Sequence, residues 1–269
     1  MIDTGDLRRQ IAELEWYHTL DLAPGITTPG WFDTRQVPLK IPMPASLEGC
    51  RCLDIGTFDG FWAFEMERRG GEVTAVDVID PMKWDWPVDS EEAVVTEIAR
   101  RKSAGRGFEL ARAALGSRVN RELVSVYDLD SVEIGTFDFV YLGSLLLHLR
   151  DPVRALERVR SVCRGTLLVV DAIDLEMSLL APRRPVAALD GLGRPWWWRP
   201  SVAGLVRMIM AGGFELVRPA QRVYMPPGAD QPIPALRPRM LLSAAGRTAA
   251  ITRWRGEPHA AVLARPRNG

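Results

Sequence analysis

The chain has 269 residues and a formal net charge of zero, with 47% hydrophobic and 25% charged residues. This composition is typical of a globular protein with one large domain or two small ones, and it excludes disordered, collagen-like and disulfide-stapled chains. Three cysteines and three histidines are too few for a disulfide framework or a four-ligand zinc site. No apolar run approaches the ~20 residues that cross a bilayer, and no secretory signal is visible. We therefore expect a cytoplasmic protein with no membrane segment and no metal.

Charge is unevenly distributed along the chain. From residue 194 onward, 12 arginines stand against three acids, so this region carries +9 and residues 1–193 carry −9. Such a basic region either binds an anionic partner or uses its arginines for solubility and internal ion pairs. The sequence leaves both interpretations open.

Residues 1–45 are expected to form an N-terminal cap segment. Leu7, Ile11 and Leu14 are spaced four and three apart, which predicts one amphipathic helix that ends near Tyr17. Residues 23–44 are rich in Pro and Gly and should be irregular.

Residues 46–269 are expected to form one domain in which strands alternate with helices. The expected strands cover residues 52–55, 73–77, 123–126, 137–142, 166–171 and 260–264. The expected helices cover residues 59–69, 90–101, 107–115, 151–162 and 201–212, with an insertion near 80–107. This alternation predicts βαβ units, which form an α/β fold with a mostly parallel Rossmann-like sheet and helices on both faces. Ligands of such sheets bind beyond the carboxyl ends of the strands.

The most informative segment follows the first expected strand. Asp54 lies at the strand end, and Gly56 and Gly60 form a turn into a helix. Asp77 ends the next strand, where a carboxylate accepts the hydroxyls of a ribose. The loop lacks the third glycine of dinucleotide-binding loops, and Asp59 stands where a pyrophosphate would lie. A cationic ligand tolerates this acid better, but an NAD-type oxidoreductase stays open as an alternative.

The run from Cys52 to Asp77 resembles motif I and the following acid of class I S-adenosylmethionine-dependent methyltransferases. The resemblance implies a seven-stranded sheet, S-adenosylmethionine as the cofactor and methyl transfer as the activity; a non-catalytic S-adenosylmethionine-binding protein is a further alternative. In that family an acid after the third strand meets the adenine amino group. The residues assigned to the cofactor on this basis are Asp54, Gly56, Thr57, Phe58, Asp59, Gly60, Asp77, Val78, Tyr127, Asp128, Gly143 and Ser144.

The segment after the fourth expected strand, residues 142–152, resembles the methyltransferase pattern of a His before an Asp-Pro helix start. His148 is therefore a candidate general base, and His18 is a second, because histidine titrates near neutrality. A packing role for His148 is also open. The Asn/Asp-Pro-Pro-Tyr motif of amino-group methyltransferases is missing here, which disfavours transfer to such nitrogens.

Residues 16–30 resemble the segment that precedes the methyltransferase domain in the bacterial tRNA wobble-uridine 5-oxyacetic acid synthase/methyltransferase family. The well-studied branch of that family holds a carboxylated S-adenosylmethionine with polar side chains where this chain has Leu147, Leu149 and His259. An apolar pair would leave a carboxylate unpaired, so we expect ordinary S-adenosylmethionine.

The acceptor is expected to contact aromatic and basic side chains, because rings stack on planar acceptors. The candidates are Tyr17, Trp84, Trp86, Trp198 and Arg199. We expect O-methyl transfer to a small-molecule hydroxyl, with a tRNA wobble uridine as the alternative acceptor. The oligomeric state and the acceptor's identity do not follow from the sequence.

Overall fold

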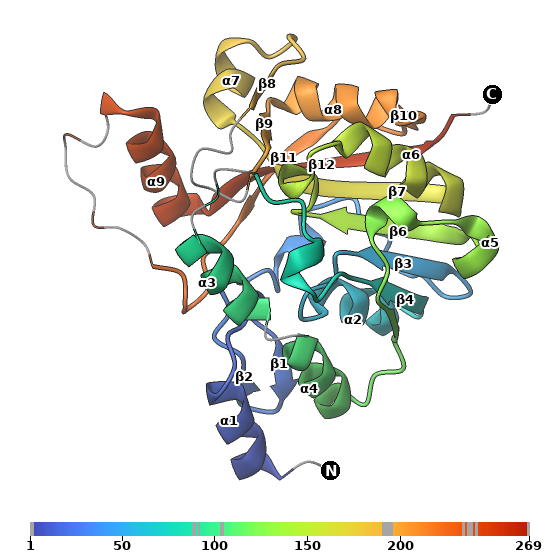
Figure 1. The fold of residues 1–269 in the computed structure, drawn as a ribbon, viewed down its shortest axis with the longest axis vertical. Coiled ribbons are helices and arrows are strands. Elements are labelled where there is room, and N and C mark those ends of the chain that lie inside the picture. Colours follow the sequence, from blue (N-terminus) through green and yellow to red (C-terminus); the bar gives the residue numbers. More distant parts are fainter. Residues whose placement is uncertain are drawn as a thin grey trace.

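The computed structural model describes residues 3–87, 90, 92–102, 105–189, 196–232, 235, 239 and 242–267. Within these ranges, a mixed central sheet runs between layers of helices (Figure 1). The α-helices are α1 (Thr4–Ala12), α2 (Phe61–Arg68), α3 (Glu92–Lys102), α4 (Arg106–Leu115), α5 (Ser131–Ile134), α6 (Pro152–Val162), α7 (Leu175–Leu180), α8 (Val202–Ala211) and α9 (Ala244–Arg255). The 3₁₀ turns are η1 (Val37–Leu39), η2 (Pro81–Lys83), η4 (Val126–Asp128) and η5 (Leu146–His148).

The central sheet has the strand order β10-β12-β7-β6-β3-β4-β5, and β11 also pairs with β12. Its strands are β3 (Arg51–Ile55), β4 (Glu72–Val76), β5 (Asn120–Glu122), β6 (Phe137–Gly143), β7 (Cys163–Ala172), β10 (Phe214–Leu216), β11 (Gln221–Met225) and β12 (Glu257–Pro266). Two small antiparallel sheets pair β1 (Asp21–Ala23) with β2 (Ile26–Thr27) and β8 (Ala187–Leu189) with β9 (Trp198–Pro200).

Strands β5, β4, β3, β6 and β7 are parallel, and β12 is antiparallel to β7. The chain moves outward from β3 through β4 to β5 and then returns to β6 on the other side of β3. The strand order therefore reverses at β3, and this is the position where open α/β sheets bind their ligands. The expected α/β Rossmann-like fold with a mostly parallel sheet is confirmed.

The two faces of the sheet have separate hydrophobic cores. One core joins the sheet to the N-terminal segment, α2 and α4, and includes Trp16, Phe64 and Phe108. The other joins it to α6 and α8, and includes Leu156 and Leu205. Residues 7–43 thus pack into the same core as one face of the central sheet rather than into a core of their own.

Helix α6 begins where its sequence predicts. The Asp151 carboxylate accepts a hydrogen bond from the Arg154 backbone N–H at 2.9 Å, and Pro152 occupies the first turn. Asp is a favourable N-cap, and Pro in the first turn loses no helical hydrogen bond. Ala155, Leu156 and Val159 are fully buried against the sheet.

Two elements differ from the expectation. The third parallel strand lies at Asn120–Glu122 instead of 123–126, and Leu123 is 61% exposed. Strand β5 lies at the edge of the sheet and pairs only with β4, so its pairing does not require apolar side chains. Helix α1 ends at Ala12 instead of near Tyr17. The residues after it form a loop, and the Trp16 indole N–H donates to the Ile11 carbonyl at 3.1 Å, which leaves that carbonyl engaged outside the helical pattern.

The structure also contains elements that the periodicity did not indicate. Helices α7 and α9 were not expected, and β11 adds an eighth strand to the seven that the resemblance implied. Both β10 and β11 pair with β12, β10 near its end and β11 near its beginning.

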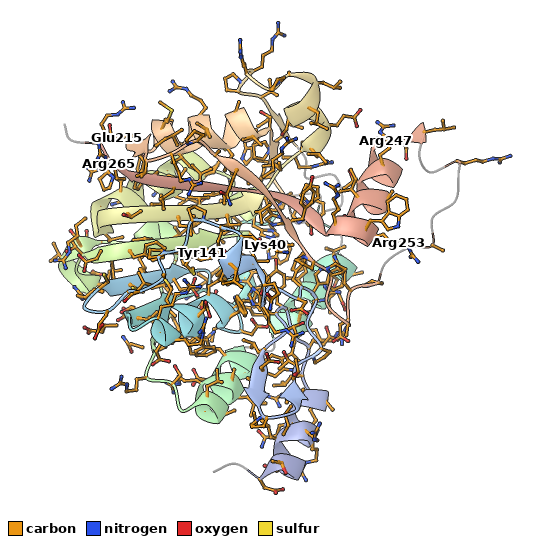
Figure 2. All side chains as sticks on the ribbon, turned by 180° about the vertical axis from the view of Figure 1, so that it is seen from behind. Lys40, Tyr141, Glu215, Arg247, Arg253 and Arg265 are labelled. Atoms are coloured by element: carbon orange, nitrogen blue, oxygen red, sulfur yellow. The ribbon has the colours of Figure 1, made fainter. Side chains whose placement is uncertain are left out.

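Arginines of the basic C-terminal region form ion pairs with acids. Arg265 bonds Glu215 at 2.7 Å, and Arg247 bonds Glu176 at 2.7 Å. Figure 2 shows Glu215 and Arg265 on one side of the molecule and Arg247 and Arg253 of α9 on the opposite side. Among the described residues, no helix is both long and apolar enough to span a membrane.

Candidate functional site

A cavity of about 700 Å³ lies at the carboxyl ends of the parallel strands. Its wall includes Asp54 of β3, Gly143 of β6 and Ala172 of β7, and it extends to the first residues of β12. Helix α3 closes one side and lies with α9 at the left of Figure 1, beyond the ends of the strands. A volume between ~300 and 1,000 Å³ is typical of sites for small ligands.

The loop between β3 and α2 has the backbone of a ligand cradle. Gly56 has φ +77° and Phe58 has φ +55°, a left-handed conformation that is uncommon for a side chain other than glycine. The Gly56 N–H donates to the Val76 carbonyl at 2.9 Å, which ties the loop to β4. Gly56 and Phe58 both line the cavity. The predicted turn therefore brings the backbone to the surface of the cavity.

Asp54 is a buried carboxyl in the cavity wall. It is 1% exposed, and its Oδ2 atom has no hydrogen-bond partner among the described residues. Burial raises the pKa of Asp54 to about 7, because the charged form loses its hydration. A buried acid with one unpartnered oxygen suits a cationic or hydrogen-bond-donating ligand better than a pyrophosphate.

Asp77 lies at the end of β4, as predicted, but its carboxylate is already engaged. It accepts hydrogen bonds from the backbone N–H groups of Phe58 at 3.1 Å and of Val78 at 2.9 Å. The Lys102 ammonium lies 2.6 Å from Oδ1 and 2.5 Å from Oδ2, and both side chains are 5% exposed. Burial lowers the pKa of Lys102, and the neighbouring Asp77 acts in the opposite direction. Because a carboxylate has about four acceptor positions, a ribose has to displace Lys102 or share Asp77 with it.

Asp59 does not face the cavity. Its Oδ2 accepts the backbone N–H groups of Tyr17 and His18, each at 2.8 Å, and its Oδ1 bonds His18 Nδ1. Asp59, predicted to contact the cofactor, is therefore not among the residues of the cavity wall. The acid instead fixes the N-terminal segment on the β3–α2 loop and orients the His18 ring, which lines the cavity.

Replacing Asp59 by Ala is expected to lower the free energy of unfolding by about 2 kcal/mol, because two buried backbone donors lose their acceptor. Urea denaturation measures the loss, and limited proteolysis should cleave residues 13–45 faster. Asp59→Asn is the matched control, since its amide oxygen still accepts from the backbone, and it should lose less. An unchanged midpoint for Asp59→Ala would contradict the anchoring role.

The segment that follows β4 forms another wall of the cavity. The Trp84 indole donates to the Val78 carbonyl at 2.7 Å, and Trp84 and Trp86 pack with ring centroids 5.3 Å apart. Asp85 accepts from the Tyr127 hydroxyl at 2.7 Å and from the Arg150 backbone N–H at 2.6 Å. These bonds hold residues 78–86 against the loops after β5 and β6.

A polar cluster joins the loop after β6 to β12. The Ser144 hydroxyl lies 3.0 Å from His259 Nε2, and Ser144 has φ +48°. Tyr17 packs edge-on to Phe32 at 5.3 Å, and Phe32 packs edge-on to His259 at 6.5 Å. The N-terminal segment and β12 thus meet at the cavity.

Thirteen of the predicted site residues line the cavity. They are Tyr17, His18, Asp54, Gly56, Phe58, Asp77, Val78, Trp84, Trp86, Tyr127, Gly143, Ser144 and His148.

Five further predicted residues lie outside this wall. Thr57 is buried and Gly60 forms the N-cap of α2, so both support the loop from beneath. Asp128 is exposed, and Ser125 and Tyr127 line the cavity in its place. Arg199 pairs with Asp174 at 3.0 Å, and the Trp198 indole donates to the Arg150 carbonyl at 3.0 Å. Of the tryptophan triplet, Trp196 is the residue in the wall.

Several wall residues were not predicted. In the sequence, Lys102 is an ordinary basic residue directly after the expected helix 90–101. Glu257 is an isolated acid in a basic region. Trp31 lies in the wall with the Arg101 guanidinium 3.8 Å above its ring. The sequence does carry one signal for Glu257. It lies two residues before His259, so the two side chains would face the same side of an extended segment.

Residues 53–169 match the model of a family described as a methyltransferase domain. No curated protein matches the sequence. The N-terminal domain of EvdMO1, solved with S-adenosylhomocysteine and D-fucose, is 16% identical with a TM-score of 0.56, covering 99% of this chain and 98% of that one. The same domain solved with S-adenosylhomocysteine alone gives the same values.

A chain from the complex of the Haloferax volcanii Trm112 methyltransferase activator with a methyltransferase is 16% identical with a TM-score of 0.51, covering 88% of this chain and 90% of that one. These likenesses establish a shared fold. With the domain match, they support an S-adenosylmethionine-dependent methyltransferase as the class of enzyme and S-adenosylmethionine as its cofactor, in place of the oxidoreductase alternative.

Proposed function

We propose that the protein transfers a methyl group from S-adenosylmethionine to a hydroxyl of a small-molecule acceptor. The observation that carries this proposal is the cavity, which joins the β3–α2 loop and Asp77 to a second set of aromatic and polar side chains around Ser144, Glu257 and His259. The methyltransferase domain match covers the first set, and the second set offers room for an acceptor next to it.

The residues of the first set fit the cofactor. Asp54 presents an unpartnered buried carboxyl oxygen, and the left-handed turn at Gly56 and Phe58 lets the backbone approach a ligand closely. In our proposal Asp77 receives the ribose hydroxyls, Val78 and Tyr127 enclose the adenine, and Gly143 lies beside the methionine portion. When bound, S-adenosylmethionine supplies an electrophilic methyl group on a positively charged sulfur.

The chain's own contribution is to position the acceptor and exclude water. Holding an acceptor oxygen in line with the methyl group can contribute ~7–11 kcal/mol to the rate. His18, oriented by Asp59, and His148 line the cavity and are the candidate bases predicted from the sequence.

A tRNA wobble uridine is the second candidate acceptor. Helix α9 carries Arg253 and Arg255 beside Trp254, which is 77% exposed. Exposed aromatic rings with arginines suit single-stranded RNA. The resemblance of residues 16–30 to the tRNA-modifying family favours the same acceptor.

The experiment combines binding with transfer. Calorimetry with S-adenosylhomocysteine should give saturable binding to the whole chain. Tritium-labelled S-adenosylmethionine is then incubated with bulk tRNA or with a panel of hydroxylated aromatic compounds. We expect label in extractable small molecules. Label in acid-precipitated RNA, with activity that falls steeply as salt rises, would replace the small-molecule acceptor with RNA. Failure to bind S-adenosylhomocysteine would contradict the proposal as a whole.

A further inference from the structure

The beginning of β12 places two polar side chains in the cavity wall. Glu257 and His259 are separated by Pro258, so they face the same side of the strand. Because β12 is antiparallel to β7, His259 pairs with Ala172, the last residue of β7. The first residues of β12 therefore lie at the edge where the parallel strands end.

Both nitrogens of His259 are occupied. Nδ1 lies 3.1 Å from the Glu257 carbonyl oxygen, which only accepts, so Nδ1 carries the proton and donates. Nε2 then accepts from the Ser144 hydroxyl at 3.0 Å. Burial lowers the pKa of His259 to about 4, which keeps the ring neutral. His259 is thus a positioning residue and not a proton acceptor for a ligand.

The Glu257 carboxyl, in contrast, has no hydrogen bond to any residue that the structure describes. The charges of Arg199 and Asp171 act on the pKa of this carboxyl, which in turn acts on the pKa of Tyr17. The neutral His259 ring lies two residues further along the strand. Burial raises the pKa of Glu257 to about 7, and Arg199 partly opposes this change. A base whose pKa lies near the working pH is well suited to proton transfer.

The surroundings of this carboxyl indicate the acceptor's chemistry. Aromatic rings of Phe32, Tyr17, Trp31 and Trp196 line the same cavity. Of the cations in the wall, Arg101 stacks on Trp31 and bonds Glu97 at 2.9 Å, and Lys102 bonds Asp77. Lys83 is exposed and belongs to the segment after β4, not to β12. Rings beside a free carboxylate favour a flat, uncharged donor of a hydrogen bond and disfavour an anion.

We propose that Glu257 is the general base of the reaction and that the acceptor is a phenol, whose ring packs between the aromatic side chains and whose hydroxyl donates to the Glu257 carboxylate. This inference rests on the proposed function. The acceptor O–H bond breaks and its proton passes to Glu257. The oxygen's electron pair forms the new O–CH₃ bond, and the electrons of the S–CH₃ bond stay on the sulfur, which leaves as neutral S-adenosylhomocysteine. The proton on Glu257 then returns to solvent.

The test compares wild type with Glu257→Gln, using 2-naphthol and catechol as acceptors and cyclohexanol as an aliphatic control. We expect the wild-type rate to rise with pH and level off near pH 7, because the base acts only when deprotonated. Glu257→Gln should lose ~10²–10⁴-fold in rate and lose this inflection, while its affinity for S-adenosylhomocysteine changes less than twofold. Glu215→Gln, whose carboxylate pairs with Arg265 and does not line the cavity, should behave as wild type.

Three results would overturn the inference while leaving the proposed function intact, provided that S-adenosylhomocysteine still binds. The first is a Glu257→Gln variant that keeps the rate and the inflection. The second is a loss of the inflection in His18→Gln or His148→Gln instead. The third is binding of S-adenosylhomocysteine without methylation of either phenol. If S-adenosylhomocysteine does not bind, the proposed function itself fails.

Discussion

Replacing Asp77 by Ala should both destabilise the fold and remove cofactor binding, for separate reasons. The substitution leaves the buried Lys102 ammonium without its partner, and breaking a buried ion pair costs about 3–5 kcal/mol. It also removes the charged acceptor proposed for the ribose hydroxyls, which should weaken S-adenosylhomocysteine binding by about 1.5–3 kcal/mol. Urea denaturation and calorimetry measure the two effects.

The double variant Asp77→Ala/Lys102→Met separates them. With both charges gone, stability should rise well above that of Asp77→Ala, because paired removal of buried ions is often neutral. It should stay below wild type, since the buried Arg121 guanidinium, 3.5 Å from Asp77, also loses this partner. Cofactor affinity should stay low, since the ribose still lacks its acceptor. Lys102→Met alone should bind at least as well as wild type, because it frees acceptor positions on Asp77. Wild-type affinity in the double variant would show that Asp77 does not hold the ribose.

The sequence predicted those parts of the site that depend on neighbours along the chain. Asp54, Gly56 and Phe58 belong to one strand–turn–helix unit, and its turn lies where predicted, at the wall of the cavity. The cap of α6 at Asp151 is equally local, and it begins where predicted. A strand end, a glycine turn and a capping residue are each specified by a few adjacent residues.

The contacts that the sequence did not predict join residues far apart in the sequence. Asp59 carries the spacing of a cofactor-binding acid, but its partners are Tyr17 and His18, about 40 residues earlier. Lys102 reaches Asp77 across 25 residues, and only the packing of α3 against the end of β4 brings them together. Neither pairing produces a periodic pattern in the sequence, because tertiary packing determines which residue a buried charge contacts. Glu257 was missed for the same reason, since its burial depends on the antiparallel placement of β12.

Replacing Gly60 by Ala should cost roughly 2–5 kcal/mol of stability, the sum of two penalties. Gly60 has φ +95°, a left-handed conformation that costs a residue with a Cβ roughly 1–2 kcal/mol. A Cβ there would lie 2.4 Å from Phe64 Cε2 and 2.8 Å from Phe108 Cδ2. These rings are buried and stacked 5.3 Å apart, so relieving the overlap means repacking the core, at roughly 1–3 kcal/mol.

Gly116→Ala is the matched control, because Gly116 also has positive φ, +62°, but has open space around its would-be Cβ. It should lose only the conformational part, roughly 1–2 kcal/mol. The difference in urea midpoints between the two variants then measures how rigidly Phe64 and Phe108 support the turn. Gly60→Ala should in addition bind S-adenosylhomocysteine less tightly than Gly116→Ala, because the same residue ends the loop that carries Gly56 and Phe58. Equal losses in both measurements would mean that the rings move aside freely and that the loop is not held by the core beneath it.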